Sequence, residues 1–216
     1  MYSTVQKNLL QHYNKMNTEY RKIVDYLLLK SPYIHDIGLF HGKMGVVVSL
    51  YAYANKYQDQ LLEDFAWDLL QQIYENVHTD MPIGMEYGLA GIGYGTTLLS
   101  KLGLVECDLN SVLADVDAKI MERDPRRMSD YSVRTGAGGV LLYLSLRQET
   151  CGTLLTFDNL YMAELKSAAA DKVMPNPDTD ILGILNKPLF AACDYMEKPI
   201  GIDGGSAYYI LKDILS

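Results

Sequence analysis

The amino-acid sequence predicts an all-α protein made of helical hairpins, with an inner and an outer layer of helices. Three observations lead to this fold class. Apolar residues recur at helical spacing, whereas short alternating runs bounded by hairpin turns are almost absent. Amphipathic and wholly apolar segments follow one another along the chain. A glycine-rich motif precedes the apolar segments at intervals typical of a repeat architecture.

The first three helices are predicted at residues 5–29, 43–54 and 58–77. The first ends at Ser31-Pro32, because a proline disfavours the helical conformation in the residue before it. The second is apolar nearly all round, as is expected of a helix that others cover on several sides. The third has apolar residues on one side and polar residues on the other, which suits a helix of the outer layer.

The next four helices are predicted at residues 89–102, 108–121, 140–146 and 158–173. The segments 89–102 and 140–146 are mostly apolar, so we assign them to the inner layer. The segment 108–121 is amphipathic and fits the outer layer. Apolar residues at helical spacing also favour a helix at 158–173.

The composition indicates one packed domain over residues 1–216. Hydrophobic residues make up 49% of the chain and charged residues 21%, which is enough for a core. The net charge of −8 argues against a nucleic-acid-binding protein, which needs basic residues against phosphate. No uncharged apolar stretch reaches the roughly 18–20 residues of a membrane-spanning helix, and the first residues do not resemble a secretory signal.

Three cysteines, Cys107, Cys151 and Cys193, are widely spaced. They form no CxxC motif and no Cys/His pair at the spacing of a metal site. We therefore expect free thiols, as in a reducing cytoplasm, and a cytoplasmic protein. The alternative is a zinc site assembled from these cysteines and a histidine.

The glycine-rich motif occurs four times. Aligning Gly42, Gly88 and Gly136 gives spacings of 46 and 48 residues, the length of one helical hairpin with its loops. No GxxxxGK[ST] motif is present, so these are not phosphate-binding loops. The four copies are residues 38–45, 84–93, 133–140 and 201–210.

Steric demands explain why glycine recurs at these places. The first glycine of a copy is expected to adopt a turn conformation closed to other residues. Glycines three positions apart share one helix face and allow a neighbouring backbone to approach closely. Because glycine costs about 1 kcal/mol relative to alanine inside a helix, its repeated use indicates that the close approach is needed.

Through these repeated glycine motifs, the sequence resembles the lanthionine synthetase C-like family. The resemblance rests on Gly38–Val46, Tyr87–Gly93 and Ile202–Gly205, and it covers residues 34–148 well and the last repeat at 201–216 plausibly. It implies an α/α toroid, in which seven hairpins usually form the ring. This chain holds about four copies, so the toroid is expected to be incomplete. The segment 150–200 shows little of the repeat.

The family's enzymes are zinc-dependent cyclases that add a cysteine thiol of a ribosomally made peptide to a dehydrated residue. Their zinc ligands are a Cys in one late repeat and a Cys-His pair in the next. This chain has no Cys-His dipeptide, and His41-Gly42 follows Phe40 where the family's cysteine would stand. We therefore expect no zinc and no zinc-dependent cyclase activity. Enzyme activity of any other kind stays open, and the implied partners are a precursor peptide or its modification enzymes.

The residues just before each glycine are the natural site candidates, because the inner helices of such a ring begin at one mouth. His41 and Asp203 are the catalytic candidates, as an acid–base pair that would form if the ring closes and brings the first and last copies together. Tyr87, Glu86 and Arg134 are the substrate-binding candidates, and Asp36 lies nearby in the sequence. The simpler alternative is that His41 and Asp203 cap helices and that Arg134 forms a surface ion pair.

Two other functions are kept beside this one. One is a non-catalytic peptide- or protein-binding scaffold of the same fold, with exposed helix edges that favour a homo-oligomer. The other is an unrelated α/α-barrel glycosidase, for which Glu86 and Asp203 would supply the two carboxylates.

Overall fold

The computed structural model describes residues 19–78, 80–152, 157–169 and 181–215. These residues form helices, turns and loops and contain no strand, which confirms the all-α class for the part of the chain that is described. Residues 5–18 of the first predicted helix and 170–173 of the last lie outside the described residues; positions 19–30 are helical, as predicted.

The helices follow the predicted order. After the helical residues 19–30 come two longer helices, α2 and α3, then α4 to α9, and α10 near the end of the chain. Their bounds are α2 Lys43–Tyr57, α3 Gln60–Asn76, α4 Leu89–Lys101, α5 Leu109–Val112, α6 Ala114–Met121, α7 Ala137–Cys151, α8 Asn159–Ala169, α9 Ile181–Ile184 and α10 Ala207–Leu215. Short 3-10 helices lie at Ser31–Tyr33 (η1), Pro125–Arg127 (η2) and Ala192–Asp194 (η4).

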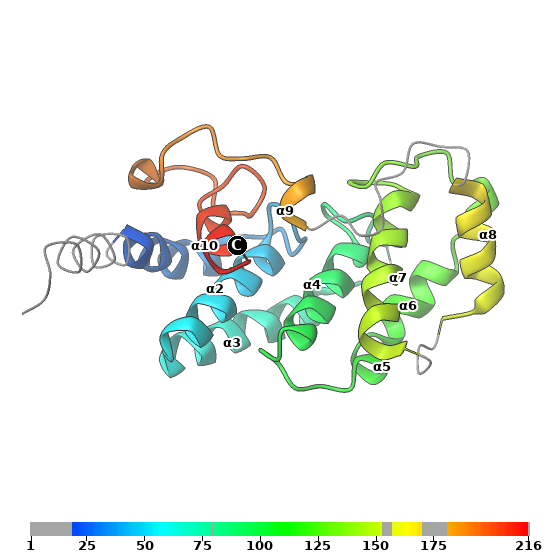
Figure 1. The fold of residues 1–216 in the computed structure, drawn as a ribbon, viewed down its shortest axis with the longest axis horizontal. Helices are drawn as coiled ribbons and strands as arrows, with labels where there is room; N and C mark the ends of the chain where they lie inside the picture. Colours follow the sequence, from blue (N-terminus) through cyan, green and yellow to red (C-terminus); the bar gives the residue numbers. More distant parts are fainter. Residues whose placement is uncertain (1–18, 79, 153–156, 170–180, 216) are drawn as a thin grey trace, which may run out of the picture.

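The four helices that follow glycine motifs pack side by side in one row. The row runs α10, α2, α4, α7, so the last motif of the chain lies against the first (Figure 1). In α2 every residue from Lys43 to Ala54 is buried, and in α4 every residue from Leu89 to Leu99. These are the helices that the sequence assigns to an inner layer. α10 and α7 stand at opposite ends of the row in Figure 1, and the ring stays a prediction.

The amphipathic helices cover this row, as predicted for an outer layer. α3 packs on α2, α6 on α4 and α8 on α7. The buried residues of α3 follow helical spacing on one face: Leu62, Ala66, Leu69, Leu70 and Ile73. Asp59 caps this helix by accepting a hydrogen bond from the Leu62 amide at 3.1 Å.

Two predicted helices differ from the structure by more than a few residues or by a break. The segment 108–121 is two helices rather than one, because Leu113 departs from helical angles at φ −100° and ψ 7°. The segment 140–146 is part of a longer helix, Ala137–Cys151. The prediction stopped at the charge of Arg147, but this side chain is fully buried and its Nη2 lies 3.0 Å from Asp117 Oδ2.

The glycine motifs place neighbouring loops in direct backbone contact. A β-carbon at Gly38 would lie 2.5 Å from the Glu86 carbonyl oxygen, and one at Gly201 would lie 2.4 Å from that of Phe40. The prediction of a special turn conformation is wrong for these first glycines, since neither has a positive φ. They are needed because a side chain would separate the loops.

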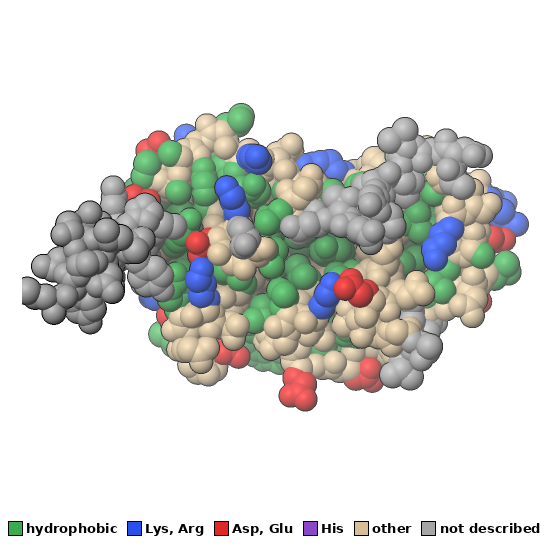
Figure 2. All heavy atoms as spheres, in the orientation of Figure 1, with side chains coloured by type: hydrophobic (Ala, Val, Ile, Leu, Met, Phe, Trp, Pro, Cys, Tyr) green, Lys and Arg blue, Asp and Glu red, His purple; other side chains and the backbone are tan. Residues whose placement is uncertain are grey.

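No described helix is long and apolar enough to cross a membrane. On the face drawn in Figure 2, positive and negative side chains are scattered among apolar ones, and the described residues form no broad basic patch there.

Candidate functional site

The loops that precede the four inner helices are joined by backbone hydrogen bonds in the order of the row. The Asp203 amide donates to the Phe40 carbonyl at 3.0 Å, and the Phe40 amide donates to the Glu86 carbonyl at 3.3 Å. The Glu86 amide in turn donates to the Arg134 carbonyl at 2.9 Å. Each of the four glycine motifs therefore presents a residue to the same place.

Four side chains, one from each motif, meet there and form what we call the four-loop cluster: His41, Glu86, Arg134 and Asp203. His41 Nε2 lies 2.9 Å from Glu86 Oε1 and 3.6 Å from Asp203 Oδ2. Arg134 bridges both carboxylates, with Nη1 3.2 Å from Glu86 Oε1 and Nη2 2.6 Å from Asp203 Oδ1. The two carboxylates are thus held between an imidazole and a guanidinium.

Burial differs sharply within the four-loop cluster. The carboxylates are covered, with Asp203 4% and Glu86 13% exposed, while His41 and Arg134 are 34% and 31% exposed. Water or a ligand can therefore reach the imidazole and the guanidinium while the carboxylates hold them from behind. Two carboxylates and one guanidinium leave one net negative charge when the imidazole is neutral.

The ion pairs set the ionisation of Asp203 and Arg134. Burial raises the pKa of Asp203, but hydrogen bonds from Arg134 and Asn186 outweigh it, so the pKa lies below its ordinary value. Burial lowers the pKa of Arg134, but its pairs with Asp203 and Glu86 outweigh it and raise the pKa. Both groups are charged at neutral pH.

Aromatic rings flank the cluster. The centre of the Tyr87 ring lies 5.6 Å from that of His41, and the Tyr87 side chain is 47% exposed. The Arg134 guanidinium lies over the Phe40 ring at 4.9 Å, a cation–π contact. Asp36 faces its own loop, where its Oδ1 accepts a hydrogen bond from the Gly38 amide at 2.7 Å. The accessible surface at the site is thus a phenol, an imidazole and a guanidinium.

The structure brings the sequence-predicted candidates together but pairs them differently. The first and last copies do meet, yet the nearest partner of His41 is Glu86 rather than Asp203. Asp203 binds Arg134, and its carboxylate accepts hydrogen bonds from the Asn186 amide at 2.6 Å and from Asn186 Nδ2 at 3.2 Å. The sequence did not indicate Asn186, because this residue lies in the segment 150–200, outside every glycine motif.

Among the described residues, the three cysteines are not gathered with a histidine into the alternative zinc site. Cys193 is exposed, while Cys107 and Cys151 are half-buried. Arg147 Nη1 donates a hydrogen bond to Cys151 Sγ at 2.9 Å, so this sulfur lies beside a positive charge. Within the described residues, no three His, Cys, Asp or Glu side chains are grouped so that they could hold a metal ion.

The geometry also bears on the glycosidase alternative. A general acid of that reaction needs a carboxyl group that keeps its proton near neutral pH. Arg134 contacts both carboxylates, and the pKa of Asp203 is lowered rather than raised. Asp203 is therefore unsuited to that acid role. What the cluster offers instead is an imidazole oriented by a carboxylate, which can accept a proton or a hydrogen bond.

Comparison of the chain with protein-family models, with curated proteins and with solved structures found no match.

Proposed function

We propose that this chain is a short lanthionine synthetase C-like protein that binds a ribosomally made peptide at the four-loop cluster, without zinc-dependent cyclase chemistry. The proposal includes an incomplete α/α toroid, of which α10, α2, α4 and α7 form the inner layer. The observation that carries it is the convergence of His41, Glu86, Arg134 and Asp203. Four loops far apart in the sequence each contribute one polar side chain to one end of the row.

The chemistry of the site suits recognition of a peptide. The imidazole of His41 and the guanidinium of Arg134 are accessible and can hydrogen-bond to backbone carbonyl groups or polar side chains. The half-exposed Tyr87 ring adds an apolar surface that costs little conformational entropy to fix. In the proposed metal-free site, His41 is the group that could accept the proton of a substrate thiol.

The binding test uses a fluorescein-labelled model peptide that contains dehydroalanine and cysteine, followed by fluorescence anisotropy. We expect saturable binding that Tyr87→Ala weakens by several fold. Trp67→Ala is the matched control, because Trp67 on α3 is 46% exposed against 47% for Tyr87. Absence of saturable binding, or equal weakening by both substitutions, would contradict the proposed site.

The catalytic part is tested separately. The same peptide is incubated with the protein, with and without added zinc, and its remaining free thiol is alkylated and counted by mass spectrometry. We expect ring formation at the rate seen in buffer. Metal analysis of the purified protein is expected to find no stoichiometric zinc. Zinc-dependent acceleration, or one zinc per chain bound by cysteines, would overturn the metal-free proposal.

One observation favours a second candidate, a non-catalytic scaffold. Each charged group of the four-loop cluster is paired within the cluster, so the role of the ion pairs could be to stabilise the packing of the repeats and nothing more. A scaffold of this kind would use its helix edges to bind a protein or a second copy. A sedimentation coefficient that rises with protein concentration, together with no peptide binding, would favour this candidate.

A further inference from the structure

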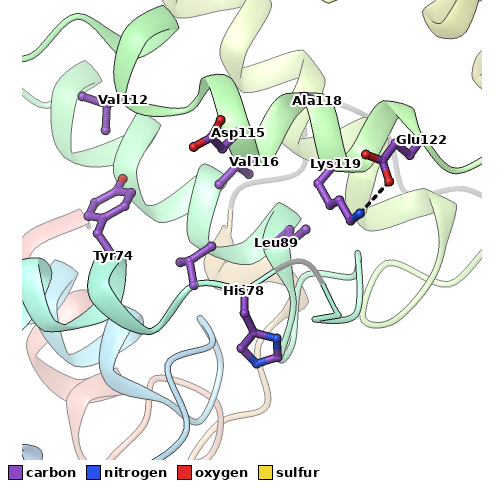
Figure 3. A pocket seen from close by; sticks show the side chains of 10 residues that line it. Tyr74, His78, Leu89, Val112, Asp115, Val116, Ala118, Lys119 and Glu122 are labelled. Carbon is purple, nitrogen blue, oxygen red and sulfur yellow. Dashed lines mark hydrogen bonds and ion pairs between the residues drawn. The ribbon is translucent and has the colours of Figure 1, made fainter.

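A pocket of about 350 Å³ lies between the end of α3 and the helices α5 and α6 (Figure 3). It shares no lining residue with the four-loop cluster. Its volume falls near the lower end of the range for small-molecule sites, so it has room for one ring with a short chain.

The inner part of the pocket is apolar. Leu89, the first residue of α4, and Val116 of α6 are 1% and 2% exposed and line it together with Val77 at the end of α3. The Tyr74 ring forms one side, and its hydroxyl is occupied by a hydrogen bond with Thr96 Oγ1 at 2.6 Å. These side chains can bury the apolar body of a ligand but offer it few hydrogen bonds.

Charge is confined to the rim, mostly on one face of α6. Lys119 Nζ donates to Glu122 Oε2 at 2.6 Å, so these two charges largely neutralise each other (Figure 3). Asp115 stands one helical turn before Lys119, and within the described part of the chain its carboxylate makes no ion pair or hydrogen bond. His78 lies on the opposite side, on the loop after α3. The three charged side chains of α6 at the pocket, Asp115, Lys119 and Glu122, therefore sum to one net negative charge.

We infer that this pocket binds a small organic ammonium ion with an apolar body. The body would lie on Leu89 and Val116, and the ammonium group would pair with Asp115. An organic carboxylate would instead meet Asp115 with the same sign of charge. The net charge of −8 adds a long-range attraction for cations over anions. This inference does not depend on the proposed peptide-binding function.

Three probes with similar apolar bodies test it: 2-phenylethylamine, 2-phenylethanol and 3-phenylpropanoate. Each is titrated into the full chain while amide resonances are followed by NMR. We expect saturable shifts at the end of α3 and on α6 with the amine, weaker shifts with the alcohol and the weakest with the carboxylate. Equal responses to all three probes, no response, or shifts confined to other helices would overturn the inference.

A pair of variants isolates the contribution of the carboxylate. Asp115→Asn removes the charge in the pocket, and Asp68→Asn removes an exposed charge on α3 that does not line it. We expect the first to weaken binding of the amine by about 2- to 5-fold, as for an exposed ion pair, and to leave binding of the alcohol unchanged. The second should change neither. Equal dissociation constants for the two variants would refute the role of Asp115.

Discussion

The four-loop cluster makes a strong prediction about stability, because one guanidinium holds two carboxylates. Replacing Arg134 by methionine keeps a long apolar stem but removes the contacts to Glu86 and Asp203. Hydrogen bonds to charged groups contribute about 1.5–3 kcal/mol each. Arg134 is 31% exposed, so solvent screening reduces that contribution. We expect a loss of about 2 kcal/mol in the free energy of unfolding.

In a chain of this size, that loss corresponds to a decrease of about 4–8 °C in Tm. Thermal denaturation followed by circular dichroism measures it, with Arg123→Met as the control. Arg123 is more exposed than Arg134 and forms no ion pair within the described residues, so its loss removes an arginine without removing such a contact. Equal melting temperatures for the two variants would refute the bridging geometry. A double-mutant cycle with Asp203→Asn should show that the two substitutions are not additive.

The pH dependence gives a second check on the same contact. The pKa of Asp203 is lower in the folded protein than its ordinary value, so its ionised form favours the folded state. Its contribution is present above the unfolded pKa of about 3.9 and is lost as the pH falls through the lower folded value. The stability difference between the wild type and Asp203→Asn should therefore be largest near neutral pH and vanish in acid. A constant difference would be inconsistent with this ion pair.

Three further outcomes are expected. Arg147→Met should cost about 3–5 kcal/mol in chemical denaturation, because it leaves the buried Asp117 without its cation; a loss below about 1 kcal/mol would contradict this, since that is the value of an exposed pair. Gly93→Ala should destabilise by about 1–3 kcal/mol in thermal denaturation, because its β-carbon would lie 2.5 Å from Tyr143 Cζ; an unchanged Tm would show a looser contact. Maleimide labelling with mass spectrometry should modify the exposed Cys193 before the half-buried cysteines, and the opposite order would argue against this burial.

The helical layers could be predicted because their signal is local. An apolar stretch such as residues 43–54 needs cover on all sides wherever it lies, and the one-sided pattern of 58–77 needs cover on one side only. The burial of α2 and α3 confirms both predictions. The end of α7 could not be predicted in this way. A charged residue ordinarily lies at the surface. Arg147 can be buried because Asp117, which is far away in the sequence, forms an ion pair with it.

The sequence indicated which residues lie near one another in the candidate site, but not which side chains contact each other. Repetition of the motif indicates which residues occupy equivalent places, so His41, Glu86, Arg134 and Asp203 could be selected from the sequence. Which imidazole contacts which carboxylate depends on the order of the loops in space, and the neighbours here are the last motif, the first and the second. Asn186 has no equivalent in the other copies, so repetition gave no signal for it.

The ion pairs that assemble the site also hold the repeats together, and this decides which variants can test function. A substitution at Glu86 or Asp203 removes a candidate binding group and a contact between loops at once, so lost binding would not separate the two causes. Tyr87 is less involved in the contact between loops, because its ring is half-exposed beside His41 and its hydroxyl, which interacts with Glu86, carries no charge. If Tyr87→Ala loses peptide binding while its Tm matches that of Trp67→Ala, the loss belongs to recognition rather than to folding.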